Sequence, residues 1–137
     1  MTSFKHIVIV GCGRLGGVLA NQLSGMGHSL VIIDRRKSAF DKLSADFSGY
    51  KIIGDAVEMQ VLHEARIQDA DYLFAVTTAD NANLMVAQVA KEVFGVPNVV
   101  ARVYDPAREA IYARFGIQTI SPTKLSADAY LKYIHEK

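Results

Sequence analysis

The chain has 137 residues, of which 50% are hydrophobic and 21% are charged, and its 15 Lys and Arg nearly balance its 14 Asp and Glu. This size and composition are typical of one soluble domain with its own core, and we expect a single domain over residues 1–137. Because basic residues are neither in excess nor clustered, nucleic acid is not expected as a partner.

Apolar runs of strand length alternate with segments of helical periodicity along the whole sequence. From the N-terminus, strands are expected at residues 5–10, 28–34, 50–55, 71–78, 98–103 and 117–120. The segments that follow them are expected to be helical, at residues 15–26, 38–46, 55–65, 80–94, 106–116 and 122–134. This alternation predicts an α/β, Rossmann-like, doubly wound sheet of about six parallel strands with helices on both faces.

Local signals mark the ends of several expected helices. Side-chain caps are expected at Ser38 (with Asp41), Asp55 (with Glu58), Asp80 and Asp105 (before Pro106). Glycines are expected to end helices at Gly27, Gly95 and Gly116.

The sequence GCGRLG at residues 11–16 fits the pattern G-x-G-x-x-G between a predicted strand and a predicted helix. Gly11 then allows a tight turn, Gly13 lets a phosphate approach the backbone, and Gly16 lets the helix pack close to the sheet. A phosphate would lie on the unpaired N–H groups at the positive end of the helix. The residues expected to bind a nucleotide here are Gly11, Cys12, Gly13, Arg14, Leu15 and Gly16. The alternative is a purely structural turn.

Asp34 ends the second predicted strand, eighteen residues after Gly16, where an acid is expected to accept hydrogen bonds from ribose hydroxyls. A 2′-phosphate about 4 Å from this carboxylate would be repelled by up to roughly 4 kcal/mol per unit charge at an effective dielectric near 20, so NADP is disfavoured. Arg35 and Arg36 are either solvated or available to neutralise such a phosphate. Asp34 is otherwise a turn residue.

Ligands of open α/β sheets bind outside the carboxyl ends of the strands, and further candidates lie there. They are Gly54, Asp55 and Ala56 after the third strand, Thr77 and Thr78 at the end of the fourth, and Arg102 near the end of the fifth. Asp55 is compatible with both ligand contact and helix capping. Thr77 offers a hydroxyl or is simply a β-branched strand residue. Arg102 either reaches an anionic ligand or pairs with a carboxylate such as Asp105.

Arg14 adds a full positive charge to the predicted turn. A guanidinium binds phosphate bidentately, and this position favours the terminal phosphate of ADP or ATP. The alternative is a solvated side chain.

The sequence contains no grouping typical of a catalytic or metal site. The four histidines are expected at the surface, away from the strand ends. Cys12, the single cysteine, is either a reactive thiol at a helix N-terminus or a small residue in a crowded turn. There is no signal peptide and no apolar run long enough to span a bilayer, so we expect a cytosolic protein that reaches a membrane only through a partner.

Two helices carry more apolar surface than one face needs. In the helix at 80–94 the extra residues are Leu84, Met85 and Phe94, and in the last helix they are Tyr130, Tyr133 and Ile134. We expect part of this surface to pack against a second copy of the chain, the alternative being burial in the core.

The glycine turn, Asp34 and the segments GDA (54–56), AVTTADNANLMVA (75–87), ARVYDP (101–106) and GIQTISP (116–122) occur in one order and spacing. In this ordered set the chain resembles the RCK family of potassium-transport regulators, also called KTN or TrkA N-terminal domains. The resemblance implies a cytoplasmic regulatory subunit that forms dimers or rings beneath a membrane potassium transporter or channel. It also implies binding of ATP, ADP, AMP or NAD(H).

The resemblance implies a role for individual residues. Arg14 would contact phosphate, Asp34 the ribose, and Asp55 with Ala56 the adenine. Asn83 and Arg102 would lie on the phosphate side of the cleft. Arg36 stands where many relatives carry a second acid, and the sequence lacks the C-terminal ligand-sensing domain that is common in the family. The function expected is therefore a non-enzymatic nucleotide sensor; the alternatives are an NAD-dependent oxidoreductase, or its detached cofactor domain, and a nucleotide-independent scaffold.

Overall fold

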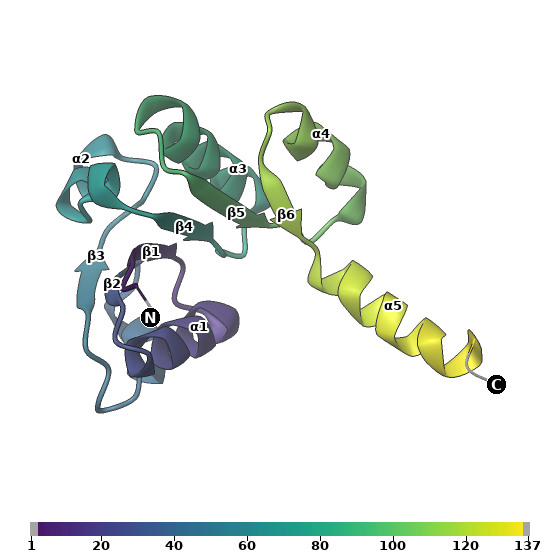
Figure 1. The fold of residues 1–137 in the computed structure, drawn as a ribbon, viewed down its shortest axis with the longest axis horizontal. Coiled ribbons are helices and arrows are strands. Elements are labelled where there is room, and N and C mark those ends of the chain that lie inside the picture. The colour runs from purple at the N-terminus through teal and green to yellow at the C-terminus, as the bar shows by residue number, and fades with distance from the viewer. Residues whose placement is uncertain (1–2, 136–137) are drawn as a thin grey trace.

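The computed structural model describes residues 3–135, which form one six-stranded parallel sheet in the order β3-β2-β1-β4-β5-β6. The strands are β1 (His6–Val10), β2 (Ser29–Asp34), β3 (Tyr50–Ile53), β4 (Tyr72–Ala75), β5 (Asn98–Arg102) and β6 (Gln118–Ile120). From β1 the chain first builds outward through β2 to β3, then returns to place β4 on the other side of β1 (Figure 1). The gap between β1 and β4 is the topological switch point of the sheet, where ligands of such folds bind.

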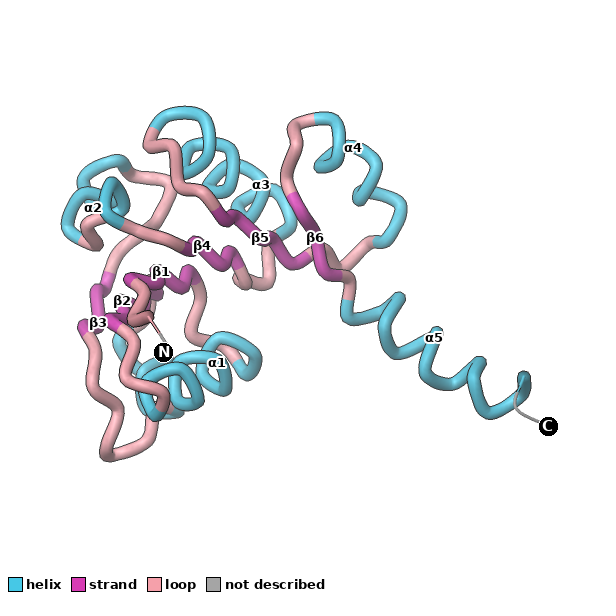
Figure 2. The backbone as a smooth tube through the Cα atoms, in the orientation of Figure 1, coloured by secondary structure: helices cyan, strands magenta, loops and turns pink. Residues whose placement is uncertain are grey.

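Helices lie on both faces of the sheet, which confirms the predicted fold class (Figure 2). The helices are α1 (Arg14–Gly25), α2 (Met59–Glu64), α3 (Asp80–Gln88), α4 (Glu109–Arg114) and α5 (Pro122–His135). The shorter turns are the 3₁₀ helices η1 (Lys37–Lys42), η2 (Ile67–Asp69) and η4 (Pro106–Arg108), and the π-helical turn η3 (Val89–Val93), which continues α3.

The core has two parts, one on each side of the sheet. On one side α1 and η1 pack on β1 and β2, and on the other α2, α3 and Tyr112 of α4 pack on β1, β2, β4 and β5. Figure 1 shows α1 on one side of the sheet and α2 and α3 on the other. All five residues of β1 are buried, as expected from an apolar run without polar alternation. The central strands are therefore fixed from both faces, and their carboxyl ends are held in place.

The expected side-chain caps were mostly wrong. Ser38 lies in a 3₁₀ helix that Arg36 precedes without a side-chain cap, and α2 begins after Glu58, so Asp55 does not cap it. The carboxylate of Asp80 accepts hydrogen bonds from the backbone of Tyr104 and Asp105, at 2.9 and 3.3 Å, and leaves α3 uncapped. Asp80 thus bonds to a distant segment, whereas Asp55 bonds to the amide of Val57 before α2 begins.

Other signals for helix ends held. Asp105 does accept a hydrogen bond from the amide of Ala107, with Pro106 at the first helical position, but the turn that it caps is η4. Gly27, Gly95 and Gly116 all have positive φ angles at the ends of helices.

The last helix, α5, projects away from the rest of the domain (Figure 1), and none of its described residues is buried. Its exposed large side chains are Leu125, Tyr130, Leu131, Tyr133 and Ile134. The sheet face that carries α1 is also incompletely covered near β6, where the side chain of Ile120 is 49% exposed. In residues 3–135 no helix combines the length and the apolar character needed to cross a membrane.

Candidate nucleotide-binding cleft

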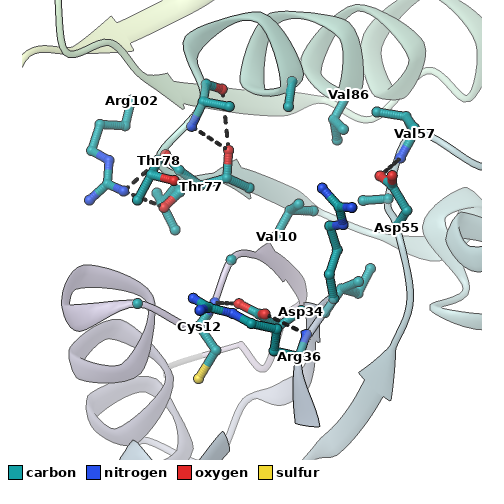
Figure 3. Close-up of a pocket in the computed structure, with 18 of the residues that line it drawn as sticks. Val10, Cys12, Asp34, Arg36, Asp55, Val57, Thr77, Thr78, Val86 and Arg102 are labelled. Atoms are coloured by element: carbon teal, nitrogen blue, oxygen red, sulfur yellow. Dashed lines mark hydrogen bonds between the residues drawn. The ribbon is translucent and has the colours of Figure 1, made fainter. Parts of the chain in front are cut away.

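A cleft of about 550 Å³ lies at the carboxyl ends of the central strands, at the switch point between β1 and β4 (Figure 3). Its apolar lining consists of Val10, Ile33, Ala56, Val57, Val76, Ala79, Ala82 and Val86. Its polar lining consists of Asp34, Arg35, Arg36, Lys42, Asp55, Thr77, Thr78 and Arg102, with the turn Gly11, Cys12 and Gly13. The cleft thus combines an apolar wall with a few convergent polar groups, as small-molecule sites do.

Two glycines of the turn are required by the packing of the protein. Gly11 has a φ of +108°, and a Cβ on it would lie 2.9 Å from the backbone nitrogen of Thr77. A Cβ on Gly16 would lie 1.8 Å from the carbonyl oxygen of Gly11. Larger residues at either position would push the turn off β4 or off α1, so both glycines are explained without a ligand.

Gly13 differs from these two glycines. Its φ of −83° is open to any residue, and a Cβ added to it would meet nothing within 4 Å. The same residue is the N-cap of α1, which has no side-chain cap and no acidic residue in its first turn. The N–H groups at the start of a helix have no partner within it and attract anions. The turn therefore presents uncapped donors beside a glycine that leaves room above the backbone.

Asp34 joins the end of β2 to the glycine turn (Figure 3). One carboxylate oxygen accepts a hydrogen bond from the amide of Cys12 at 2.8 Å, and the other accepts one from the amide of Arg36 at 2.9 Å. A carboxylate has about four acceptor sites, so each oxygen can accept a further bond. The carboxylate is thereby oriented at the cleft with capacity for the hydroxyl groups of a sugar.

Cys12 is a packing residue in this structure. Its side chain is fully buried and its Sγ lies 3.3 Å from the carbonyl oxygen of Ala39. Burial, followed by the charge of Asp34, raises the pKa of the Cys12 thiol above its ordinary value of 9.0. The thiol stays neutral at physiological pH, which favours the small-residue interpretation over the reactive thiol.

Cations lie on the same side of the cleft as Asp34. Arg35, Arg36 and Lys42 line it, and the Arg36 side chain runs beside the Asp34 carboxylate toward Cys12 (Figure 3). Both arginines therefore line the cleft, and their side chains are exposed to solvent.

Asn83 is fully buried and holds the end of β4 in place. Its Oδ1 accepts from the amide and the hydroxyl of Thr77, at 2.9 and 2.6 Å. Its Nδ2 donates to the carbonyl oxygens of Thr77 and Arg102, both at 3.0 Å. Every bonding site of the amide group is engaged inside the protein, so Asn83 supports the cleft wall from behind.

Arg102 carries the positive charge deepest in the cleft wall. Its Nη2 donates to the carbonyl oxygens of Val76 and Thr77, at 2.6 and 2.9 Å, and its Nε is buried without a partner (Figure 3). The expected alternative, a pair with Asp105, is not formed, because the Asp105 carboxylate bonds to Ala107 instead. Arg102 thus holds its positive charge in the lining of the cleft, bonded to the end of β4.

The wall opposite the glycine turn comes from the segment after β3. The carboxylate of Asp55 accepts a hydrogen bond from the amide of Val57 at 3.1 Å, which folds this segment toward the cleft. Gly54 lies behind it, where a Cβ would be 2.9 Å from a methyl carbon of Val61. Asp55, Ala56 and Val57 thus present one carboxylate and an apolar surface to the cleft.

The TrkA-N domain model matches residues 7–122. The chain belongs to the TrkA-N domain family. It is 43% identical over 127 residues to the Trk system potassium uptake protein TrkA of Streptomyces coelicolor. The aligned region covers 93% of this chain and 57% of that relative. The chain therefore spans little more than half the length of this relative.

Solved structures agree with the TrkA-N assignment. The AMP-bound form of the Kef CTD of Shewanella denitrificans has a TM-score of 0.78 at 28% identity, over 89% of this chain and 74% of that one. The GsuK RCK domain has a TM-score of 0.78 at 24% identity, over 92% of this chain and 27% of that one. The resemblance to the RCK and TrkA N-terminal family is confirmed.

The TrkA-N cleft gathers ten of the fifteen predicted site residues: Gly11, Cys12, Gly13, Asp34, Arg35, Asp55, Ala56, Thr77, Thr78 and Arg102. The five outside its lining are Arg14, Leu15, Gly16, Gly54 and Asn83. Arg14 is exposed at the start of α1, next to Gly13. Sequence reasoning missed Lys42, which comes from η1 and carried no signal, and Val57 and Ala79, which directly follow the predicted strand ends.

His6 corrects the expectation that the histidines lie at the surface. Its side chain is only 8% exposed, and its ring bonds to the hydroxyl of Ser29 at 2.9 Å and to the carbonyl oxygen of Ala65 at 3.0 Å. These contacts lie at the amino end of the TrkA-N sheet, away from the cleft. His6 therefore connects β1, β2 and the end of α2 as a structural residue.

Proposed function

We propose that this TrkA-N chain is a non-enzymatic regulatory module of a potassium uptake system, controlled by an adenine nucleotide that binds in the cleft. The nucleotide is ATP, ADP, AMP or NAD(H). The curated relative from Streptomyces coelicolor is named as a Trk system potassium uptake protein, and the similar Kef CTD structure is an AMP-bound form. These names support the class of transport and of ligand.

The observation that carries the proposal is Gly13. Neither its φ angle nor the space around its missing side chain requires a glycine, yet it stands at the uncapped start of α1 in the cleft lining. A phosphate oxygen that approaches the amides of this turn needs the space that a side chain would fill. A ligand explains why this N-cap is a glycine, whereas the fold alone favours Ser, Asp or Asn there.

The cleft accommodates the parts of the nucleotide in a definite order. The phosphates lie on the amides that follow Gly13, with Arg14 and Arg102 as neighbouring cations, and the ribose lies against Asp34. The adenine lies between the apolar wall and the segment Asp55 to Val57. NADP is disfavoured because its 2′-phosphate would lie against the Asp34 carboxylate, and Asn83 acts from behind through Thr77.

The partners proposed are a second copy of the chain and a membrane potassium transporter or channel subunit, reached on the cytoplasmic side. An exposed α5 with Tyr130, Leu131 and Ile134 on one side offers an apolar surface for the second copy. The nucleotide acts by its difference in affinity between two arrangements of the paired subunits, and a ligand without such a difference shifts nothing.

Gly13→Ala tests the proposal, with Gly25→Ala as its matched control because a Cβ on Gly25 also meets nothing within 4 Å and Gly25 lies outside the cleft. Binding of AMP, ADP, ATP and NADH is measured by calorimetry for the wild type and both variants. We expect Gly13→Ala to stay folded, with stability within about 1 kcal/mol of wild type, and to lose at least about tenfold in affinity. Equal affinities for the three proteins, or no binding to the wild type, would contradict the proposal.

A further inference from the structure

The guanidinium of Arg102 has two different surroundings. In the lining of the cleft its Nη2 is held by the carbonyl oxygens of Val76 and Thr77, and its buried Nε has no partner. Its Cζ lies over the ring of Tyr104, 4.7 Å from the ring centroid. An aromatic ring at this distance attracts a cation and restricts the plane of the guanidinium. Tyr104 itself does not line the cleft.

Tyr104 is also attached to two other parts of the chain. Its amide donates to the Asp80 carboxylate at the start of α3, at 2.9 Å. Its carbonyl oxygen accepts from the hydroxyl of Thr123 in the first turn of α5, at 3.3 Å. One residue thus touches the cation of the cleft wall, the beginning of α3 and the base of the projecting helix.

A phosphate in the cleft changes what holds Arg102. A guanidinium and a phosphate form charge-assisted hydrogen bonds that are frequently bidentate, and both partners of these bonds are ionised. A bound phosphate therefore restrains the guanidinium more firmly than Val76 and Thr77 do alone. Because the Tyr104 ring stacks on that guanidinium, the restraint extends to Tyr104 and to the hydrogen bond that its carbonyl receives from Thr123.

We propose that Tyr104 is a positioning residue that holds Arg102 for an anionic phosphate and links occupation of the cleft to the base of α5. This inference rests on the nucleotide binding proposed above. It assigns a role to a residue outside the cleft. The effect requires a phosphate group, so AMP shows it and adenosine does not. It also connects the ligand to α5, the helix that carries the exposed apolar surface.

The first test measures the affinities of AMP and adenosine for the wild type, Tyr104→Phe and Tyr104→Leu. Tyr50→Leu is the matched control, because Tyr50 is an exposed tyrosine at the start of β3 and does not line the cleft. Because Tyr104→Leu loses the cation–π contact, we expect its affinity for AMP to be about threefold to tenfold lower than that of the wild type. Tyr104→Phe keeps the ring face, so its affinity for AMP should stay within about twofold of the wild type. Adenosine, which has no phosphate, binds all four proteins alike. Equal AMP affinities for the wild type and Tyr104→Leu would overturn the positioning role.

The second test follows amide hydrogen exchange at the start of α5, where the amide of Leu125 donates to the carbonyl oxygen of Ser121. Saturating AMP slows this exchange severalfold in the wild type and in Tyr104→Phe, adenosine does not, and AMP has no effect in Tyr104→Leu. The same slowing in Tyr104→Leu, or none in wild type that calorimetry shows to be saturated, overturns the link. Failure of wild type to bind AMP at all instead overturns the proposed function, and this inference with it.

Discussion

The carboxylate of Asp34 accepts a hydrogen bond from the amide of Cys12 at 2.8 Å, so the acid that ends β2 also fixes the glycine turn after β1. The two residues are 22 positions apart in the sequence. This bond brings the expected ribose contact and the expected phosphate turn together at one end of the cleft. A change at Asp34 therefore alters both the sugar contact and the shape of the turn.

Asp34 is expected to decide between NADH and NADPH. In the wild type, repulsion of the 2′-phosphate makes NADPH bind about 100-fold more weakly than NADH or worse. Asp34→Ala removes both the repulsion and the ribose contact. The affinity for NADH therefore falls, and the affinities for NADH and NADPH become more similar. Fluorescence titration measures both ligands, with the exposed Asp41→Ala as control. If the ratio of the NADH and NADPH affinities were the same in Asp34→Ala as in the wild type, the ribose would not bind at Asp34.

Arg14 is expected to serve the terminal phosphates. Its side chain is exposed beside Gly13, so it reaches a ligand that extends beyond the first phosphate more readily than AMP. Arg14→Ala should weaken ATP and ADP by about tenfold, the scale of one charge-assisted contact, and leave AMP nearly unchanged. Calorimetry with the three nucleotides checks this, and Arg114→Ala removes an exposed arginine far along the chain as control. Equal losses for all three nucleotides would refute a terminal-phosphate role.

Asn83 is expected to contribute to stability as well as to binding. Asn83→Ala leaves the amide of Thr77 without its partner and removes the donor to the buried carbonyl oxygen of Arg102, and each unsatisfied group costs about 1–3 kcal/mol. We expect a loss of about 3 kcal/mol in the free energy of unfolding in urea, together with weaker nucleotide binding. Asn81→Ala changes an exposed asparagine of the same helix and should cost less than about 1 kcal/mol. If Asn83→Ala and Asn81→Ala had similar free energies of unfolding, the hydrogen bonds of Asn83 would not contribute to stability.

The raised pKa of the Cys12 thiol predicts that the folded chain loses stability at alkaline pH. Its pKa is raised in the folded chain, so above the ordinary value of 9.0 the unfolded chain gives up the thiol proton first. The contribution of the neutral Cys12 thiol to the free energy of unfolding is therefore complete below pH 9.0 and is lost as the pH rises toward the pKa of Cys12 in the folded chain. The pKa of Tyr112 is raised by burial and acts in the same direction from 10.0 upward.

Urea unfolding at pH 7, 8.5 and 9.5 checks this prediction. The free energy of unfolding of the wild type should fall between the last two values, and Cys12→Ala should fall less, because it has no thiol to titrate. Tyr112 is present in both proteins and cancels from the comparison. Parallel pH profiles, or rapid reaction of the folded thiol with a disulfide reagent at pH 8, would argue against a buried neutral thiol.

The exposed side of α5 is expected to hold two copies of the chain together. Tyr130→Glu combined with Leu131→Glu places two charges on the apolar side and should shift the protein toward monomer in sedimentation velocity. Lys132→Glu, about 160° around the helix from Tyr130 and from Ile134, introduces an acid on the other side and should leave assembly unchanged. A monomeric wild type, or equal effects of both changes, would exclude α5 as the interface.

The fold was predictable from the sequence because its signals are local. The run at β1, the glycine spacing and the periodic apolar residues of α1 lie within one short stretch and need no distant partner. The order of the motifs then indicated the family. The strand ends also placed most of the cleft residues, because parallel strands bring their carboxyl ends to one edge of the sheet.

The errors came from contacts between distant parts of the chain. Asp80 has the sequence features of a cap, but its carboxylate bonds to Tyr104, 24 residues later. His6 is buried because its ring meets Ala65, 59 residues away. Asn83 stood out only through the family resemblance, and its role depends on Arg102 of a neighbouring strand. No local pattern encodes these pairings.

The hydrogen bond that Asp34 makes to the glycine turn has a kinetic consequence. The turn has its shape before any ligand arrives, since it is braced by Asp34 on one side and by the closeness of Gly11 to Thr77 on the other. Association then requires little ordering of the backbone, and such preorganised sites bind without a slow closing step. Under the function proposed above, the response to a change in nucleotide supply is then limited by how fast the bound nucleotide dissociates.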